Sequence, residues 1–403
     1  MRRLAIPTIG ALLALALAGP SAAVERSEFL ASAPDYENHE WVCSEQNTTG
    51  VDCPPDYISD FTPGTYYGLP YDWGGFVTLD EYDADLAEGQ GAGSHSDDGV
   101  LSCTTGLDCS GYVSILWELP YKHGTSTLHN VSDEIDARDM WPGDVYNNAG
   151  SHVIMWVTKD ESGDAYITES SGTCNGVCGR SVSWSYFGSY VPMRPDELYV
   201  QTATVGSYAG TIEDPIPVDG FPFTDWRNTR EATSDAFDYY SAAPDVNESG
   251  PEFVYQLELA GTGTFSASVV DAPQTDIDLQ LLGSLDADDC LARADIELTH
   301  EIESPGTYYL TADSWVGSVE YAGAYRLEID YDGAADTDVD GDIDGDADTD
   351  GDADTDSDGD ADVDDGCAEG TGDCGCDDSC GCRVTGHRAS PGLLTLVVSL
   401  LLG

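Results

Sequence analysis

Apolar and polar positions follow two different periods in the first half of the chain. Between Ser110 and Pro120 the apolar residues recur at helical spacing, which predicts an amphipathic helix that ends before the proline. The runs SHVIMWV at 151–157 and AYITESS at 165–171 instead favour strands, and SYVPMRP at 189–195 favours another. Residues 24–200 are therefore predicted to form an α+β domain.

The second half has little helical periodicity and alternates short β-type runs with turn clusters. These runs are FVYQLELAG from Phe253, TFSASVVD from Thr264, DIDLQLLG from Asp276, SPGTYYLTAD from Ser304 and GAYRLEIDY from Gly323. Their spacing predicts an all-β sandwich over residues 221–331. The proline-rich stretch at 215–222 predicts a linker, which we place at 201–220.

The first 23 residues have the pattern of a secretory signal. Arg2 and Arg3 precede an apolar run that is too short to span a membrane, and small residues ending at Ala23 follow it. Residues 1–23 are therefore predicted to be a cleaved signal peptide. We expect the mature protein to be secreted or anchored at the outer cell surface.

Twelve cysteines in an exported chain predict disulfide bonds. The natural local pairs are Cys43 with Cys53 and Cys174 with Cys178, whereas Cys103 and Cys290 have no obvious partner. The spacing alone does not assign the other pairs.

The chain is acidic throughout, with a formal net charge of −62 and only two lysines, Lys122 and Lys159. Electrostatic repulsion disfavours binding to nucleic acid phosphates and to anionic lipids. High salt screens repulsion between surface carboxylates. The composition therefore suits a saline habitat and predicts a stability that rises with NaCl.

The C-terminal part contains two unusual segments. Residues 332–366 are an Asp-rich run that favours a disordered, solvated spacer; the alternative is weak calcium binding through Asp354, Asp356, Asp358 and Asp365. No register supplies the closing glutamate of an EF-hand loop.

Residues 367–403 hold a cysteine cluster and an apolar end. This segment resembles the C-terminal sorting signals of myxobacterial surface proteins, which implies anchoring near Cys382; a small disulfide knot is the alternative.

The segment LDCSGYV places a cysteine where a loop meets the predicted helix. Asp108 is in position to cap this helix, and Cys109 would lie in its first turn, facing free backbone N–H groups. A cysteine attacks a carbonyl group as the thiolate, which a helix N-terminus and an imidazolium both favour. The alternative for Cys109 is a structural disulfide, for example with Cys103.

Four elements in order resemble the NlpC-type peptidoglycan cysteine peptidases. They are YDWGG at 71–75, LDCSGYV at 107–113, MWPGDVYN at 140–147 and SHVIMWV at 151–157. The resemblance covers about residues 64–195 and implies a papain-like α+β fold that needs no cofactor. It also implies that Cys109 is the nucleophile, that His152 is the general base, and that Tyr71 lies beside the nucleophile at the substrate end of the cleft.

The third catalytic residue departs from the family pattern. That position is commonly a histidine on the strand after His152, but the strand here reads YITES. We predict Glu169 in this role, because a carboxylate can orient an imidazole and stabilise its cation; Thr168 is the alternative by alignment with the family. Trp73 is expected in the core, and Asp144 is expected to have a structural role in a turn.

Residues 78–105 form a long acidic insertion between YDWGG and DCSG. A loop of this length near an active site can cover the cleft or change its specificity. His95, within it, is expected to be solvated.

The second domain resembles the bacterial pre-peptidase C-terminal β-sandwich, through DIDLQLL, SPGTYYLTAD and YAGAYRLEI. Asp276 and Asp278 are expected to be surface acids, with calcium binding as the alternative. Together the resemblances predict a cysteine peptidase or amidase that cleaves amide bonds in peptidoglycan stem peptides through a thioester. The alternative is a catalytically inactive surface binding or adhesion protein.

Overall fold

The computed structural model describes residues 23–202 and 206–333. The predicted signal peptide, the four calcium candidates, Cys382 and almost all of the two C-terminal segments therefore lie outside the described residues. The helices are α1 (Arg26–Asn38), α2 (Leu79–Glu88) and α3 (Cys109–Leu116). The strands are β1 (Val24–Glu25), β2 (Glu40–Cys43), β3 (Gly64–Tyr67), β4 (Gly91–Ala92), β5 (Thr104–Thr105), β6 (Ser132–Glu134), β7 (Val145–Asn148), β8 (His152–Lys159), β9 (Ala165–Ser171), β10 (Gly176–Val182), β11 (Val191–Pro195), β12 (Val200–Gln201), β13 (Ile216–Val218), β14 (Phe223–Asn228), β15 (Glu252–Leu259), β16 (Gly263–Asp271), β17 (Ile277–Leu282), β18 (Cys290–Ala294), β19 (Glu297–Ile302), β20 (Gly306–Ser314) and β21 (Ala324–Tyr331).

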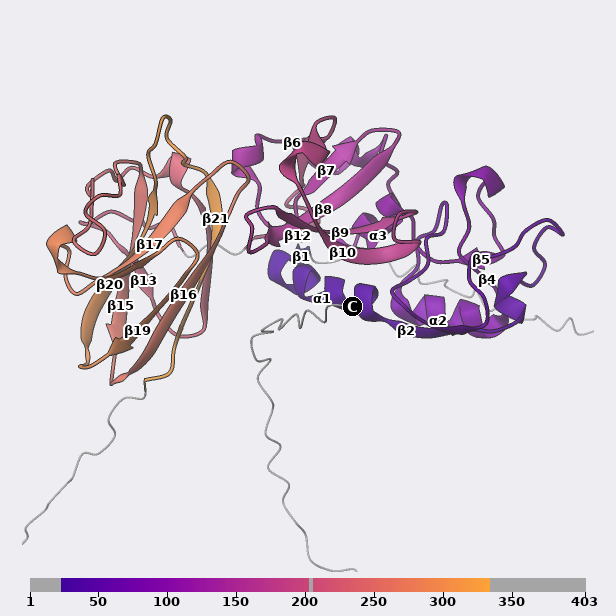
Figure 1. The fold of residues 1–403 in the computed structure, drawn as a ribbon, viewed down its shortest axis with the longest axis horizontal. Coiled ribbons are helices and arrows are strands. Elements are labelled where there is room, and N and C mark those ends of the chain that lie inside the picture. Colours follow the sequence, from indigo (N-terminus) through magenta and orange to yellow (C-terminus); the bar gives the residue numbers. More distant parts are fainter. Residues whose placement is uncertain (1–22, 203–205, 334–403) are drawn as a thin grey trace, which may run out of the picture. The chain divides into compact units, whose positions relative to one another are not determined.

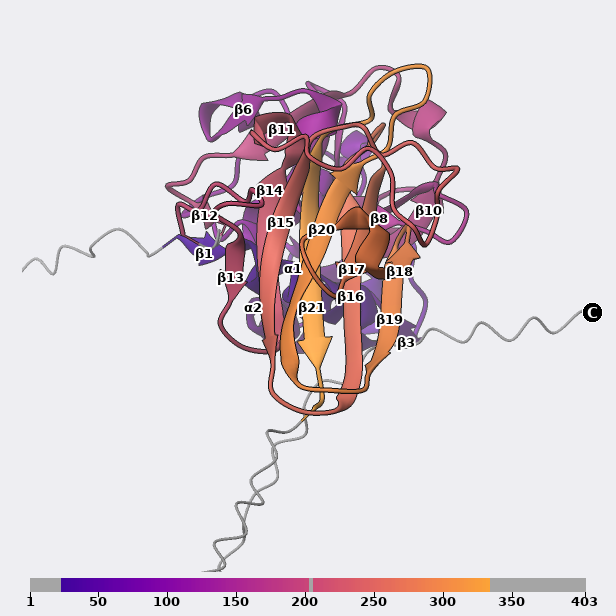
Figure 2. The same cartoon turned by 90° about the vertical axis from the view of Figure 1, so that its left-hand side faces the viewer.

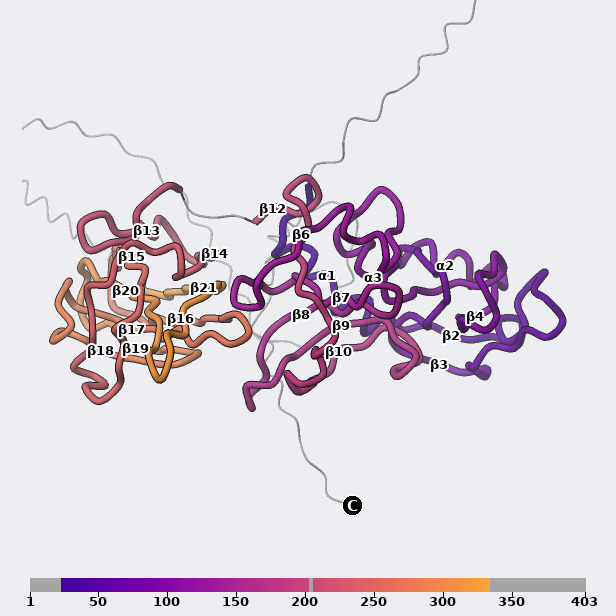
Figure 3. Tube along the Cα trace, turned by 90° about the horizontal axis from the view of Figure 1, so that it is seen from above, coloured from indigo at the N-terminus to yellow at the C-terminus, as the bar shows by residue number. Residues whose placement is uncertain are grey.

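The first part of the chain is a β-rich α+β structure built on an antiparallel sheet in the order β10-β9-β8-β7-β11-β6 (Figure 1). Helix α3 contacts β8 and β9, and α1 contacts both α3 and β10 (Figure 3). The side chains of strand β8 alternate between two core clusters. Val153 and Met155 pack in the cluster that contains α3, whereas Ile154 and Trp156 pack in a second cluster.

Helix α3 begins at the predicted residue and ends earlier than predicted. Asp108 is its N-cap, and the Asp108 side chain accepts a hydrogen bond from the backbone N–H of Gly111. The helix stops at Leu116, because Glu118 adopts a left-handed backbone with φ of 49°. The termination therefore precedes Pro120.

The insertion at 78–105 is an ordered part of the fold. Thr78 and Glu81 form a capping box at the start of α2, and the fully buried Tyr82 of α2 packs edge-on against Trp41. Its later part forms β4 and β5, which pair in parallel. The contact of Tyr82 with Trp41 thus anchors the start of the insertion, and the β4–β5 pairing joins its middle to its end.

The second part of the chain is a β-sandwich. One sheet has the order β13-β15-β20-β17-β18 and the other β14-β21-β16-β19; Figure 2 shows these strands side by side. Every second residue of β15, β16 and β21 joins one shared core cluster. Strand β13 lies within the stretch that we predicted to be a linker, and it pairs in parallel with β15. The sheet thus begins before residue 221.

One of the two acids that were expected at the surface, Asp278, is buried, whereas Asp276 is partly exposed. Asp278 is 1% exposed and forms an ion pair with Arg293, which also contacts the equally buried Glu248 at 3.4 Å. Burial and the neighbouring Glu248 carboxyl raise the pKa of Asp278 well above its usual range. The expectation failed because both faces of β17 are buried, so its alternate residues do not divide into exposed and buried ones.

Two disulfides join described cysteines, as is typical of proteins from oxidising compartments. Cys174–Cys178 is the predicted local pair. The prediction for Cys43 was wrong: Cys53 pairs with Cys103, and Cys43 is a buried free thiol. The partner lies 50 residues away in sequence, so spacing did not reveal it. None of the helices within the described ranges is long and apolar enough to cross a membrane.

Candidate active site

Cys109 is the first residue of α3, and its thiol is free and buried. As first-turn residues, Cys109 and Ser110 have backbone N–H groups without a partner inside the helix. The Asp108 carboxylate accepts hydrogen bonds from Ser110 Oγ at 2.9 Å and from the N–H of Gly111 at 2.7 Å. Its other oxygen accepts a hydrogen bond from the N–H of Gly74 and forms an ion pair with Lys122. Asp108 therefore ties the helix start to the YDWGG segment.

His152 and Glu169 form a close pair between neighbouring strands. His152 Nε2 lies 2.5 Å from Glu169 Oε2, and Arg180 Nε donates to Glu169 Oε1 at 2.8 Å. The Glu169 side chain has no solvent exposure, and that of His152 is 19% exposed. Since Glu169 engages Nε2, Nδ1 is the ring nitrogen left for Cys109.

The pKa values of this pair favour an imidazolium beside a carboxylate. Burial by itself would lower the pKa of His152, but hydrogen bonds to Cys109 and Glu169, with their negative charges, raise it to about 9. Burial would likewise raise the pKa of Glu169, and its contacts with His152 and Arg180 lower it instead. The hydrogen bond to Cys109 brings the thiol into the same network.

Thr168, the alternative orienting residue, has different partners. Its hydroxyl lies 2.9 Å from that of Tyr112 on α3, and both side chains are fully buried. Successive strand residues point to opposite faces, so Thr168 and Glu169 cannot both contact the imidazole. In the structure, Glu169 is the residue that contacts His152.

Backbone pairing brings Tyr71 next to the helix start. Tyr71 pairs with Leu107, and the N–H of Tyr71 donates to the carbonyl of Asn175. Burial and the charges of Cys109 and Asp108 raise the pKa of Tyr71. A Cβ atom on Gly111 would lie 1.9 Å from the carbonyl oxygen of Gly75. The second glycine of YDWGG and the glycine of DCSG are thus needed for the same close approach.

Several groups at the site were not predicted. Arg180 contacts Glu169, and its guanidinium also lies over the Tyr186 ring, 5.2 Å from the centroid. Burial and the neighbouring Tyr186 raise the pKa of Tyr190 to about 12, and the charges of Glu169 and Cys109 add to this shift. Arg180 was a possible candidate from the sequence, because the chain has only 14 lysines and arginines and this one lies within a strand.

The insertion contributes His95, which lies beside Tyr71. The His95 ring stacks on Tyr71 with centroids 6.5 Å apart, and His95 Nε2 lies 2.7 Å from Asp60 Oδ2. His95 is therefore partnered, although its side chain remains 46% exposed. Trp73 was expected in the core, but its side chain is 37% exposed. Its loop lies at the surface and contacts the insertion through a hydrogen bond from the Trp73 N–H to the carbonyl of Ser94.

Asp144, in the Pro-Gly-Asp turn, has the predicted structural role, and it also binds side chains from two other elements. It is fully buried and accepts hydrogen bonds from Arg26 at 2.7 Å and Arg194 at 2.8 Å. The Trp141 backbone N–H also donates to it. These contacts fix the start of β7 relative to α1 and β11.

Comparisons with known proteins do not identify a relative. No family model matches the chain, and no curated protein matches it. Among solved structures, it is similar to PliG from Aeromonas hydrophila, a periplasmic inhibitor of g-type lysozyme, with 9% identity over 29% of this chain and 96% of that one and a TM-score of 0.21. The insecticidal delta-endotoxin Cry8Ea1 from Bacillus thuringiensis has 10% identity over 47% of this chain and 41% of that one, with a TM-score of 0.14. Scores this low support no conclusion about fold or function.

Proposed function

We propose that the protein is an exported cysteine hydrolase that cleaves amide bonds in peptidoglycan stem peptides. The observation that carries this proposal is the network of Cys109, His152 and Glu169, in which a carboxylate orients an imidazole that is hydrogen-bonded to a free thiol. A nucleophile, a base and an orienting group in this relation are what acyl transfer through a covalent intermediate needs.

In the proposed reaction the Cys109 thiolate attacks the scissile carbonyl carbon, and the negative charge develops on the carbonyl oxygen. The backbone N–H groups of Cys109 and Ser110, which have no partner inside the helix, would stabilise such a charge. The His152 imidazolium donates its proton to the leaving amine as the C–N bond breaks, which leaves a thioester. Water, deprotonated by His152, then hydrolyses the thioester and releases the acid.

The substrate class is proposed by resemblance to the NlpC-type peptidases. Two further observations support a papain-like fold: the cysteine lies at the N-terminus of a helix, and this helix packs on an antiparallel sheet that carries the histidine. We assign the β-sandwich to the pre-peptidase C-terminal type on its sequence motifs and place the protein outside the cytoplasm, for which the two disulfides give support.

The direct test is digestion of purified peptidoglycan by the mature protein. We expect soluble peptides with new amine and carboxyl ends from wild type, and a loss of at least about 10³-fold in rate for Cys109→Ala, because the nucleophile is removed. Cys290→Ala is the matched control, since Cys290 is also a free thiol but lies in the sandwich. Equal peptide release from Cys109→Ala and wild type would refute the assignment.

Thiol labelling separates this proposal from an inactive adhesion protein with the same fold. A catalytic Cys109, in contact with His152 at the start of α3, should react with iodoacetamide at a lower pH than an ordinary thiol. We expect Cys109 to be labelled at pH 6 and Cys290 to remain unlabelled at that pH. Absence of selective labelling at low pH, together with no digestion, would favour the adhesion protein.

A further inference from the structure

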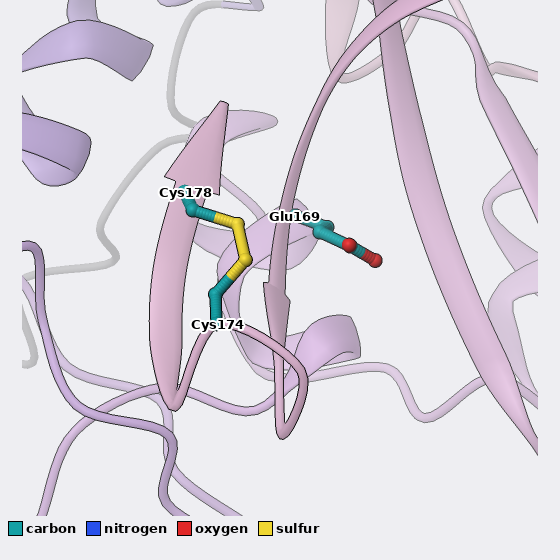
Figure 4. Close-up of side chains that lie close together, drawn as sticks. All are labelled: Glu169, Cys174 and Cys178. Atoms are coloured by element: carbon teal, nitrogen blue, oxygen red, sulfur yellow. A yellow bond between two sulfur atoms is a disulfide. The ribbon is translucent and has the colours of Figure 1, made fainter. Parts of the chain in front are cut away.

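The turn between β9 and β10 is closed by a disulfide that lies beside the proposed catalytic network. Cys174 in this turn is bonded to Cys178 on β10 (Figure 4). Cys178 is in register with Glu169 on β9, and residues directly opposite each other in an antiparallel pair project from the same face. One Glu169 carboxylate oxygen and the two sulfur atoms lie within 4.8 Å of one another. The disulfide therefore packs beside the residue that contacts His152.

The same turn also holds the segment that carries Tyr71. The three residues enclosed by the disulfide, 175–177, pair through the backbone with residues 69–71. Within this pairing, the Asn175 carbonyl accepts a hydrogen bond from the Tyr71 N–H at 3.2 Å. Tyr71 in turn pairs with Leu107, two residues before the proposed nucleophile. The turn thus contacts the site from two sides.

The disulfide constrains a backbone that the turn would not hold readily without it. Asn175 has a φ of 57°, in the left-handed region that residues with a Cβ atom seldom adopt. At Gly176, a Cβ atom would lie 2.3 Å from the carbonyl oxygen of Leu69. The bond between Cys174 and Cys178 closes a ring around these two residues and removes conformations that are open to an uncrosslinked chain. Cleavage of the bond should release the Asn175 carbonyl from its fixed position.

The bond is accessible to a reducing agent, because Cys174 and Cys178 are both partly exposed. A trialkylphosphine attacks one sulfur atom and breaks the S–S bond. Hydrolysis then gives two thiols and the phosphine oxide, with water supplying the two protons and the oxygen atom. The thiol of Cys109 is already free and is unchanged by this reagent. Reduction therefore removes the disulfide and leaves the nucleophile intact.

We propose that the Cys174–Cys178 bond positions Glu169 and Tyr71 for catalysis, so that the hydrolase is fully active only in its oxidised form. The inference rests on the proposed function. The bond acts through these two residues and does not itself react with the substrate. Its consequence has the opposite sign from the usual behaviour of thiol enzymes, whose nucleophile a reductant protects from oxidation.

Activity is measured on the full chain with the five tail cysteines (367, 374, 376, 380 and 382) replaced by serine, so that they do not respond to the reductant. Phosphine treatment should lower kcat/KM for soluble peptidoglycan fragments at least about tenfold. Cys174→Ser with Cys178→Ser should show the same loss without reductant and no further loss with it. Cys53→Ser with Cys103→Ser is the matched control, because it removes the other disulfide, and its activity should still fall on reduction.

The pH profile separates positioning from a loss of folded protein. Unfolding lowers kcat/KM by the same factor at every pH and leaves the shape of the profile unchanged. Movement of Glu169 away from His152 removes a carboxylate that raises the pKa of the imidazole, so the alkaline limb should shift to lower pH on reduction. Full activity of the reduced enzyme, or a fall without a shift of this limb, would overturn the proposal.

Two substitutions at Asn175 test the turn while the disulfide is intact. Asn175→Gly tolerates the left-handed backbone and should retain the wild-type KM, whereas Asn175→Val does not tolerate it and should raise KM. Gln274→Val is the matched control, because Gln274 also has a positive φ, 64°, but lies in an exposed turn of the sandwich. This control should leave KM unchanged. Equal KM values for the two Asn175 variants would contradict the role of the turn.

Amide hydrogen exchange measures the contact independently of activity. The Tyr71 N–H, bonded to the Asn175 carbonyl, should exchange at least about tenfold faster after reduction. The Val269 N–H, which donates to Ile296 in the sandwich, should not change. Unchanged exchange at Tyr71 would refute its positioning by the disulfide. If the oxidised enzyme digests no peptidoglycan, the proposed function fails, whereas the exchange rates still decide whether the disulfide holds Tyr71.

Discussion

At the scale of single residues, the site depends on where one carboxylate points. Glu169 contacts both His152 and Arg180, and it is nearly desolvated. A buried carboxylate with two cationic partners remains ionised and stabilises the imidazolium. The protonation of His152, and with it the proposed activity, should therefore depend on Glu169.

Glu169→Gln should shift the alkaline limit of activity to lower pH. With a His152 pKa of about 9, the imidazolium persists below that pH and is lost as the pH rises through it. Without the carboxylate charge this pKa falls, so the alkaline limb of kcat/KM should move down and the maximum should fall about 10²-fold. Glu161→Gln, in an exposed turn, is the control. An unchanged alkaline limb would contradict the role of Glu169.

Asp278→Asn should make the stability less dependent on pH. The raised pKa of Asp278 means that the folded state binds a proton that the unfolded state releases above its normal pKa near 3.8. Stability should therefore fall as the pH rises from about 4 towards the raised value. The side-chain amide of the variant carries its own N–H groups, so it can donate a hydrogen bond to Glu248 without binding a proton. Arg293 and Asp276 also act on the Glu248 carboxyl.

This effect is measured by thermal unfolding at pH 5 and pH 8. The fall in Tm between these values should be smaller for Asp278→Asn than for wild type. Asp219→Asn, at an exposed position, should retain the full difference. Identical pH dependence in all three proteins would show that the buried pair holds no extra proton.

At the scale of elements, the site is assembled where the YDWGG segment meets the start of α3. Tyr71 pairs with Leu107 through the backbone, and the N–H of Gly74 donates to the Asp108 carboxylate. Gly75 and Gly111 leave no space for a side chain between them. The glycines of the two motifs thus allow the backbones to pack closely. They affect the chemistry only because they position the neighbouring residues.

Gly111→Ala should destabilise the protein and displace Tyr71. The added Cβ would overlap the Gly75 carbonyl oxygen, and relief of such overpacking costs about 1–3 kcal/mol. Urea unfolding measures the loss, and peptidoglycan digestion should fall in parallel. Gly124→Ala is the control, because a Cβ there meets nothing within 4 Å. Equal stability of the two variants would show that the close approach is absent.

At the scale of the whole molecule, charge dominates. The chain has 76 acidic residues against 14 lysines and arginines. Both lysines form ion pairs, Lys122 with Asp108 and Lys159 with Asp271. The excess acidic charge consequently repels itself, and screening of this repulsion favours the folded state.

Stability should accordingly rise with salt. The Debye length falls from about 10 Å at 0.1 M to about 3 Å at 1 M ionic strength, which removes most repulsion between exposed carboxylates. We expect a higher Tm at each step from 0.1 M to 1 M NaCl, with a similar rise in KCl. A Tm that is constant or falls over this range would exclude adaptation to high salt.

The sequence by itself determined the local features of the protein. The start of α3 at Cys109, its Asp108 cap and the strand at 165–171 depend on neighbouring residues, so periodicity and capping rules predicted them. Only the tertiary structure decided which distant groups meet. The Cys53–Cys103 bond, the contact of Glu169 rather than Thr168 with His152, and the presence of Arg180 depend on strand register and chain closure. Register and closure join residues that are far apart in sequence, and no local pattern records them.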